Sequence, residues 1–171
     1  MTIRDCTVRD CAERDVGILE EHLPSGGTNV HAALFARHER GEISYLVAWR
    51  GGRPAGVCAI SWAGGPDLAV RAALRECPMI ANLSVLPSLR RQGTGTALLR
   101  AAEHRISERG GARVALGVAE DNVAAGRLYA RLGYVSSGLR SVSRYSFPDD
   151  NGVMREIVEH DVIVVKDIST C

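Results

Sequence analysis

The sequence predicts a single α/β domain of the α+β kind over residues 1–171, with strands and helices in the order β-α-α-β-β-β-α-β-α-β-β. Apolar residues recur with period two in some runs, as in strands, and every three or four residues in others, as in helices. Glycine, proline and asparagine clusters between the runs mark turns. A chain of this length holds one sizeable core and is short for two.

The first part of the chain predicts one strand and two helices. Thr2 to Val8 is predicted as the opening strand. The charged segment after it carries apolar residues at helical spacing and stops at the turn residues 24–27. Ala32 to Arg40 predicts a second short helix.

Two strands and a loop follow. Ile43 to Trp49 and Ala55 to Trp62 are β-rich, and Arg50 to Arg53 between them forms a hairpin turn. Ala63 to Glu76 is expected to be a loop with some helical character at Leu68 to Leu74.

The second half begins with a predicted strand at Ile80 to Val85 and a helix from Ala97 onward, whose buried stripe is Leu98, Ala102 and Ile106. Arg113 to Val118 alternates as a strand does.

The last elements are a helix and a hairpin. Asp121 or Asn122 caps the helix, which places Ala124, Leu128 and Leu132 on one side and stops at Gly133. Tyr134 to Phe147 and Met154 to Ile168 form the two hairpin arms, because residues 148–152 are a strong turn signal.

The most informative segment joins the strand at Ile80 to the helix after it, and runs from Arg90 to Thr96. The first N–H groups of a helix have no partners within it, and the positive end of its dipole faces outward. Gly93 and Gly95 let a ligand approach the backbone, and Arg90 and Arg91 add positive charge. The segment therefore predicts a site for a phosphorylated cofactor.

Two blocks resemble the GCN5-related N-acetyltransferase (GNAT) superfamily. Its cofactor signature, Arg/Gln-x-x-Gly-x-Gly/Ala, is matched by residues 90–95, and Asn82 to Val85 looks like its fourth strand. Glu120 to Asn122, Leu128-Tyr129 and Gly133-Tyr134 match a further block downstream. The resemblance implies a mixed, mostly antiparallel central sheet flanked by helices, and an enzyme that transfers acetyl from acetyl-CoA to an amine. A dinucleotide fingerprint would need a third glycine at Leu98, and a P-loop would need Gly-Lys-Ser/Thr, which is missing.

The resemblance also assigns residues of this chain to the cofactor. The backbone N–H groups of Gln92 to Thr96 hold the pyrophosphate, and the strand around Ser84 pairs with the pantetheine arm like an added strand. Asn122 both caps its helix and hydrogen-bonds the arm. The implied cofactor-binding set is Leu83, Ser84, Val85, Arg90, Arg91, Gln92, Gly93, Thr94, Gly95, Thr96, Asn122 and Tyr129.

Two residues receive catalytic roles from the resemblance. The N–H of Val85 polarises the thioester carbonyl, and Tyr129 gives a proton to the leaving thiolate. The general base stays open, because many relatives have glutamate where this chain has Met79. The alternatives are Glu76, Glu120, Glu159, His31 and a water chain. Gly117 marks either a close backbone approach or ordinary packing.

The acceptor groove of such domains lies between the segment Leu23 to Val30 and the final hairpin, from about Ser136 to Asp161. Glu156, Glu159 and Asp161 there could attract a cationic amine. A small-molecule amine is the first expectation. A protein N-terminus or lysine is the second, and a non-catalytic acyl-CoA-binding module is a further alternative. Pairing of two chains into a homodimer also stays open.

Composition and charge bear on the protein's partners, its location in the cell and metal binding. A net charge of +1 argues against a broad nucleic-acid surface, and the charged first 25 residues contain no signal-peptide core. No apolar run is long enough to span a bilayer, so the protein is expected to be cytoplasmic. The five cysteines form no CxxC pair and the histidines are not spaced as zinc ligands, so reduced thiols and no metal are expected.

Overall fold

The computed structural model describes residues 6–23, 29–75, 77–148 and 151–168. Its elements in chain order are β1 (Cys6–Asp10), α1 (Glu13–His22), α2 (Val30–Glu39), β2 (Ile43–Arg50), β3 (Arg53–Ser61), α3 (Leu68–Leu74), β4 (Met79–Val85), the 3₁₀ turn η1 (Pro87–Leu89), α4 (Thr94–Glu108), β5 (Arg113–Ala119), α5 (Val123–Arg131), β6 (Val135–Pro148) and β7 (Met154–Asp167). The fold is the expected mixed α/β arrangement with a largely antiparallel sheet.

The described strands form one seven-stranded sheet in the order β1-β2-β3-β4-β5-β7-β6. Neighbours are antiparallel except β4 and β5, which run parallel. Parallel neighbours need a crossover connection, and here α4 supplies it. The strand order therefore places the α4 turn beside the one parallel pair of the described sheet.

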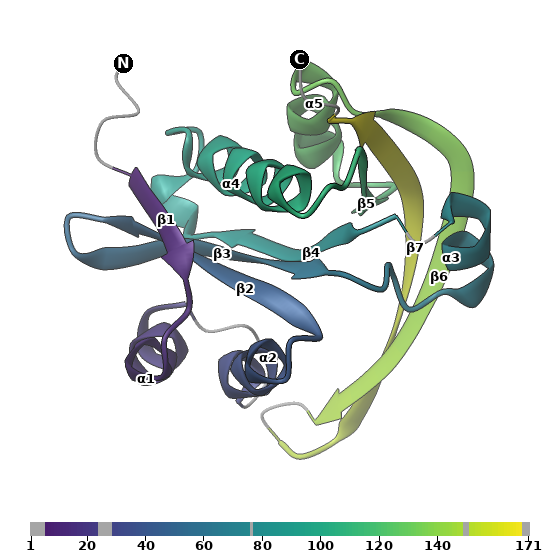
Figure 1. Cartoon of the computed structure of the whole chain (residues 1–171). Helices are drawn as coiled ribbons and strands as arrows, with labels where there is room; N and C mark the ends of the chain where they lie inside the picture. The colour runs from purple at the N-terminus through teal and green to yellow at the C-terminus, as the bar shows by residue number, and fades with distance from the viewer. Residues whose placement is uncertain (1–5, 24–28, 76, 149–150, 169–171) are drawn as a thin grey trace.

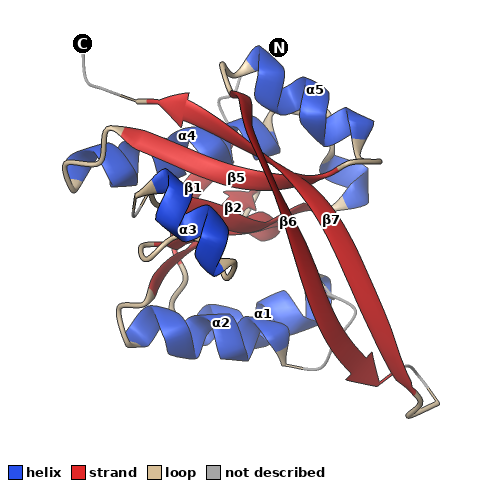
Figure 2. Cartoon of the chain, turned by 90° about the vertical axis from the view of Figure 1, so that its right-hand side faces the viewer, coloured by secondary structure: helices blue, strands red, loops and turns tan. Residues whose placement is uncertain are grey.

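Helices cover both faces of the sheet (Figure 1). One face packs against α4 and α5 through a cluster that includes Leu98, Leu99 and Ile106, all fully buried. Each such side chain contributes about 1.5–3 kcal/mol when removed from water. The other face packs against α1 and α2 around Tyr45, and against α3 around Ile163. Viewed from the side, α4 and α5 lie above the sheet and α1 and α2 below it, while β6 and β7 cross its end as a long hairpin (Figure 2).

Most predicted boundaries lie within three residues of the observed ones. The helix after the glycine turn begins at Thr94 rather than Ala97, since Gly93 is its N-cap. The opening strand is seen from Cys6 onward, and residues 2–5 of its predicted range lie outside the described residues. The turn residues 24–27 and Glu76 also lie outside them.

Two predictions needed correction. The segment Leu68–Leu74 is a full helix, capped by Asp67, so the order gains a helix between β3 and β4. On α5 Ala124 is exposed, and the residues that pack on the core are Ala125, Leu128, Tyr129 and Leu132. In so short a helix the spacing of apolar residues fits two buried faces that differ by one residue, so it could not distinguish Ala124 from Ala125. No helix within the described ranges is long and apolar enough to cross a membrane.

Candidate functional site

The sheet opens between β4 and β5. These strands pair only at Met79 with Ala115 and at Ile80 with Leu116. Beyond that point β4 continues to Val85 without a partner on this side among the described residues. An unpaired strand edge offers a row of N–H and C=O groups to an extended ligand.

A bulge lies in β4 at the opening. Val57 on β3 pairs with Ser84 and Ala59 with Ala81, so Cys58 faces two residues of β4. One of these is Asn82, whose φ of 53° is left-handed. An extra residue bends the bulged strand locally. The bend falls directly after the last β4–β5 pair, and this is where the two strands part.

The peptide groups of Val85 face away from β3. The N–H of the next residue, Leu86, donates to the carbonyl of Ala55 on β3 at 3.0 Å. In an antiparallel pair, consecutive residues direct their N–H and C=O groups to alternate edges. The Val85 N–H is therefore directed to the β5 side, into the opening. Its carbonyl is held by Arg90, whose Nε donates to it at 3.1 Å.

Side chains clamp the turn that leads into α4. Arg50, at the end of β2, donates to Gln92 Oε1 at 2.8 Å and to the Gln92 carbonyl at 3.2 Å. The Gln92 amide donates in turn to the Ser88 carbonyl at 3.0 Å. These bonds occupy the side chain and carbonyl of Gln92 and fix the turn before any ligand arrives.

The N-terminus of α4 has unsatisfied polar groups. The N–H groups of its first turn, at Thr94 to Thr96, have no carbonyl one turn earlier to bond. The Thr94 hydroxyl is buried and has no hydrogen-bond partner within the described residues. A Cβ added at Gly93 would meet no atom within 4 Å, so the space before the helix is open. Arg91 is exposed beside it. The combination is a preformed anion site.

Helix α5 approaches this turn. A Cβ on Gly95 would lie 3.5 Å from Leu128 on α5 and 3.8 Å from Val85 on β4, so the three segments are in contact. Asn122 caps α5, since its Oδ1 accepts from the N–H of Ala125 at 3.1 Å. The predicted cap is therefore present at Asn122, and its exposed amide NH₂ is left for another acceptor.

Tyr129 follows Leu128 and is buried in the cluster between the sheet and α4. Its ring packs against Tyr134 with centroids 6.0 Å apart. Burial raises the pKa of its hydroxyl, and the thiol of Cys58, under the β4 bulge, adds to that rise. No described residue accepts or donates a hydrogen bond at this hydroxyl.

A pocket of about 250 Å³ lies on the opposite face, beneath β4. Its lining includes Leu23, Val30, Leu34, Val57, Asn82 and Ser84. It therefore includes both ends of the predicted acceptor segment Leu23 to Val30, of which residues 24–28 lie outside the described residues. The pocket is mainly apolar, and its polar groups come from β4 and from a buried His31–Tyr45 pair.

His31 is held at both ring nitrogens. Nε2 lies 2.7 Å from the Leu23 carbonyl, and Nδ1 lies 2.6 Å from the Tyr45 hydroxyl. A carbonyl can only accept, so Nε2 carries the proton and Nδ1 accepts from Tyr45. This leaves no lone pair for an amine. Of the other bases considered, Glu120 pairs with Arg140. Met79, which cannot act as a base, is buried among apolar side chains.

The structure thus places the predicted site residues around one opening. Leu83, Ser84 and Val85 border it on β4, the turn from Arg90 to Thr96 closes one end, and Asn122 and Tyr129 belong to the helix beside it. Sequence reasoning placed Arg50 in a hairpin turn and missed its role as the clamp. No sequence signal joins it to Gln92, which is 42 residues away. No group of three His, Cys, Asp or Glu side chains in the described part of the chain is arranged to hold a metal ion.

The chain was compared with protein families, curated proteins and solved structures. The model of the acetyltransferase (GNAT) family matches residues 12–134. No curated protein matches the chain. Among solved structures, an N-acetyltransferase from Staphylococcus aureus Mu50 superposes with a TM-score of 0.70 at 14% identity, covering 96% of this chain and 99% of that one.

Two further structures have the same fold. The ribosomal-protein-S18-alanine N-acetyltransferase from Escherichia coli has a TM-score of 0.64 at 22% identity and covers 97% of this chain and 96% of its own. The protein yncA from Salmonella typhimurium, solved with its cofactor acetyl-CoA, has a TM-score of 0.64 at 17% identity. The match covers 98% of this chain and 96% of that one. At these identities the likeness concerns the fold. Because the family model spans most of the chain, the protein belongs to the acetyltransferase (GNAT) family.

Proposed function

We propose that this protein transfers an acetyl group from acetyl-CoA to the primary amine of a small molecule, by direct attack of the amine while both substrates are bound. The observation that carries the proposal is the opening between β4 and β5, with the Val85 N–H directed into it beside the N-terminus of α4. Family membership supports the reaction class.

The residues around the opening fit acetyl-CoA. The pyrophosphate would accept hydrogen bonds from the first N–H groups of α4 and from the Thr94 hydroxyl, which has no protein partner. The extended pantetheine arm would pair with the free edge of β4 from Leu83 to Val85. Asn122 has a spare amide for the same arm. When bound, acetyl-CoA supplies an acyl group activated as a thioester.

Val85 and Tyr129 would act on the reacting atoms. The Val85 N–H would donate to the thioester oxygen as negative charge develops there, and its carbonyl is already anchored by Arg90. Tyr129 would give its proton to the departing sulfur. A phenol whose pKa is raised by burial stays protonated at neutral pH, as an acid must.

The pocket beneath β4 favours a small acceptor. It is lined by Leu23 after α1, by α2 and by β2, β3 and β4, and its volume of about 250 Å³ suits a compact group with an apolar portion. The chain has a net charge of +1, which gives no sign of a strongly acidic groove for polycations.

The test is an amine panel with free-thiol release from acetyl-CoA as the signal. The panel contains small primary amines, peptides with free N-termini and lysine peptides. We expect turnover with small amines, and initial rates that give intersecting double-reciprocal lines, because both substrates must be bound together. Turnover confined to peptides would identify a protein acetyltransferase. Acetyl-CoA binding without turnover on any amine would identify a binding module instead.

A further inference from the structure

Asp161, considered from the sequence only as an attraction for a cationic amine, has its carboxylate beside the point where β4 and β5 part. Asp161 on β7 pairs with Ala119 on β5 and with Ser141 on β6, so it sits in the middle of three adjacent strands. A Cβ built on Gly117 would lie 3.1 Å from Asp161 Oδ2 and 3.4 Å from its Cγ. The carboxylate therefore lies over the backbone of Gly117, so close that a side chain there would press against it.

This position is where β4 and β5 separate. The last pair between them joins Ile80 to Leu116, and Gly117 is the next residue of β5. The carboxylate of Asp161, which spans from β7 across Gly117, is thus placed at the closed end of the opening.

Asp161 and Tyr129 lie on opposite faces of the sheet. Leu116 belongs to the cluster under α4 and α5 that contains Tyr129. Side chains alternate along a strand, so Gly117 and its neighbour Asp161 belong to the other face. Ile163, two residues from Asp161, packs there against α3. The pocket beneath β4 opens on the same face, since its Tyr45 and Val57 belong to the cluster under α1 and α2.

The surroundings of Asp161 contain no cation pair within the described residues. Burial raises the pKa of its carboxyl and Glu159 raises it further, while His160 opposes the rise. From β5 it meets only Gly117 and Ala119, and from β6 the hydroxyl-bearing Ser141. The side chain of Arg71, on α3, lies against Gly64.

The other carboxylates in the described core and sheet are engaged. Glu103 pairs with Lys166 and accepts from the Tyr134 hydroxyl. Glu120 pairs with Arg140, and Asp167 with Arg113. Glu20 accepts from the N–H groups at the start of α2. Asp161 differs from all of them in making no ion pair or hydrogen bond with another described residue, and its carboxylate lies beside Gly117 where β4 and β5 part.

We propose that the Asp161 carboxylate accepts the proton that the acceptor amine loses, and that Gly117 allows it to reach the opening. This rests on the proposed function. As the nitrogen–carbon bond forms and the carbon–sulfur bond breaks, the electron pair leaves with sulfur. The nitrogen's proton goes to Asp161 and the sulfur takes a proton from Tyr129, so the charges balance; solvent then restores both groups. The nitrogen becomes acidic as its lone pair is shared, which lets a carboxylate accept its proton.

The test compares Asp161→Asn with Asp167→Asn, a carboxylate on the same strand and face. We expect Asp161→Asn to lower kcat/KM for the amine by about 100-fold or more and to remove the acidic limb of its pH profile. The remaining rate should rise with pH as more of the amine becomes neutral. The affinity for acetyl-CoA, measured by calorimetry, should stay unchanged. Asp167→Asn should keep both the rate and the limb.

A second variant and an NMR measurement distinguish a loss of the base from a loss of folding. Gly117→Ala adds a methyl that would lie 3.1 Å from Asp161 Oδ2 and displace the carboxylate, so it should also lower kcat/KM while the circular dichroism spectrum is kept. NMR titration of the carboxyl carbons in the free protein should show Asp161 above the ordinary aspartate pKa and should show that Gly117→Ala moves it. An unchanged kcat/KM and pH limb in Asp161→Asn would overturn the proposal alone. A wild-type protein that acetylates no amine would overturn the proposed function, and this inference with it.

Discussion

At the scale of single residues, Tyr129 combines burial with a hydroxyl that has no partner among the described residues. Replacing it with phenylalanine removes only that oxygen. We expect Tyr129→Phe to keep the free energy of unfolding and the acetyl-CoA affinity, because no protein hydrogen bond is lost. Turnover should fall about 100-fold or more, the usual contribution of a positioned acid. Steady-state kinetics and denaturant unfolding measure the two effects.

Tyr134 is the matched control, since its ring packs on Tyr129 but its hydroxyl donates to Glu103 at 2.9 Å. Tyr134→Phe should cost about 0.5–1.5 kcal/mol of stability and leave turnover nearly unchanged. Equal losses of turnover in the two variants would argue against the proton-donor role.

Gly93 offers a second comparison at this scale. Its φ of 87° is left-handed, and Gly110 at the far end of α4 has a φ of 80°. Neither would place a Cβ near another atom. Gly93→Leu and Gly110→Leu should each cost about 1–2 kcal/mol of stability. Only Gly93→Leu should abolish acetyl-CoA binding, measured by calorimetry, because its side chain would enter the anion site. Similar affinities in the two variants would remove the turn from the cofactor site.

At the scale of elements, the N-terminus of α4 buries the Thr94 hydroxyl without a hydrogen-bond partner among the described residues, which lowers the stability of the protein without ligand. Thr94→Val keeps the shape and removes the unpaired oxygen. Stability should stay equal or rise, since an unsatisfied buried group costs about 1–3 kcal/mol. Acetyl-CoA affinity should fall about 10-fold or more, because a hydrogen bond to a charged group is lost. Thr94→Ser, which keeps the hydroxyl, should bind almost normally; a Thr94→Val protein with full affinity would contradict the assignment.

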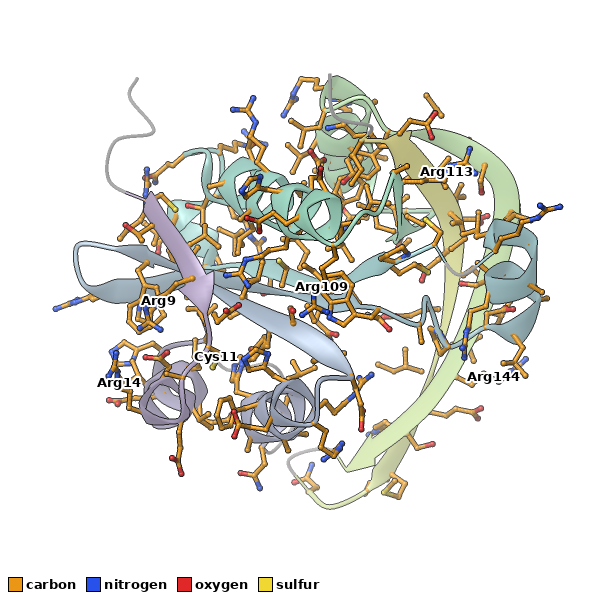
Figure 3. The ribbon with its side chains drawn as sticks, in the orientation of Figure 1. Arg9, Cys11, Arg14, Arg109, Arg113 and Arg144 are labelled. Carbon is orange, nitrogen blue, oxygen red and sulfur yellow. The ribbon has the colours of Figure 1, made fainter. Side chains whose placement is uncertain are left out.

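Helix α1 depends on an ion pair at its start. Arg9, at the end of β1 in Figure 3, donates to both oxygens of Asp15 at 2.6 and 2.9 Å, and the Ala12 N–H donates to Asp15 at 2.8 Å. These bonds lower the pKa of the Asp15 carboxyl. A lowered pKa stabilises the fold above the unfolded value of about 3.9, and that stability is lost as the pH falls through the folded value.

We therefore expect Asp15→Asn to lose about 1–3 kcal/mol at pH 7 and to show a weaker dependence on acid than the wild type. Urea unfolding at pH 7 and pH 3 measures this. Asp10→Asn is the control, because Asp10 makes the same kind of pair with Arg105 at a half-exposed site. Its loss should be about 0–1 kcal/mol. Equal losses in both variants would show that burial of Asp15 is unimportant.

At the scale of the whole molecule, the opening joins segments from both halves of the chain, so its ligand should stabilise the entire fold. A ligand at 100 times its Kd adds about 2.7 kcal/mol to the free energy of unfolding. For a domain of this size that corresponds to a rise in Tm of about 5–11 °C. Scanning calorimetry with acetyl-CoA measures it, with adenosine as the control that lacks the pyrophosphate. No rise at saturating acetyl-CoA would contradict the cofactor assignment.

The arrangement of elements followed from local patterns. The strand at Ile80, the glycine turn and the cap at Asn122 each have a signature within a few residues, because backbone conformation, capping and turn formation are local interactions. The family's motifs lie on these same elements, so the sequence predicts the glycine turn and Tyr129 as site residues.

The sequence by itself determined the order of all the elements but α3, the glycine turn before α4 and the family of the chain, since each is encoded by neighbours along the chain. Tertiary structure alone decided where β4 and β5 part, which way the Val85 N–H points, that Arg50 clamps Gln92, and that Asp161 lies over Gly117. These features join residues that are far apart in the sequence. Their contacts arise from strand pairing and packing across the sheet, which leave no periodic trace in the order of amino acids.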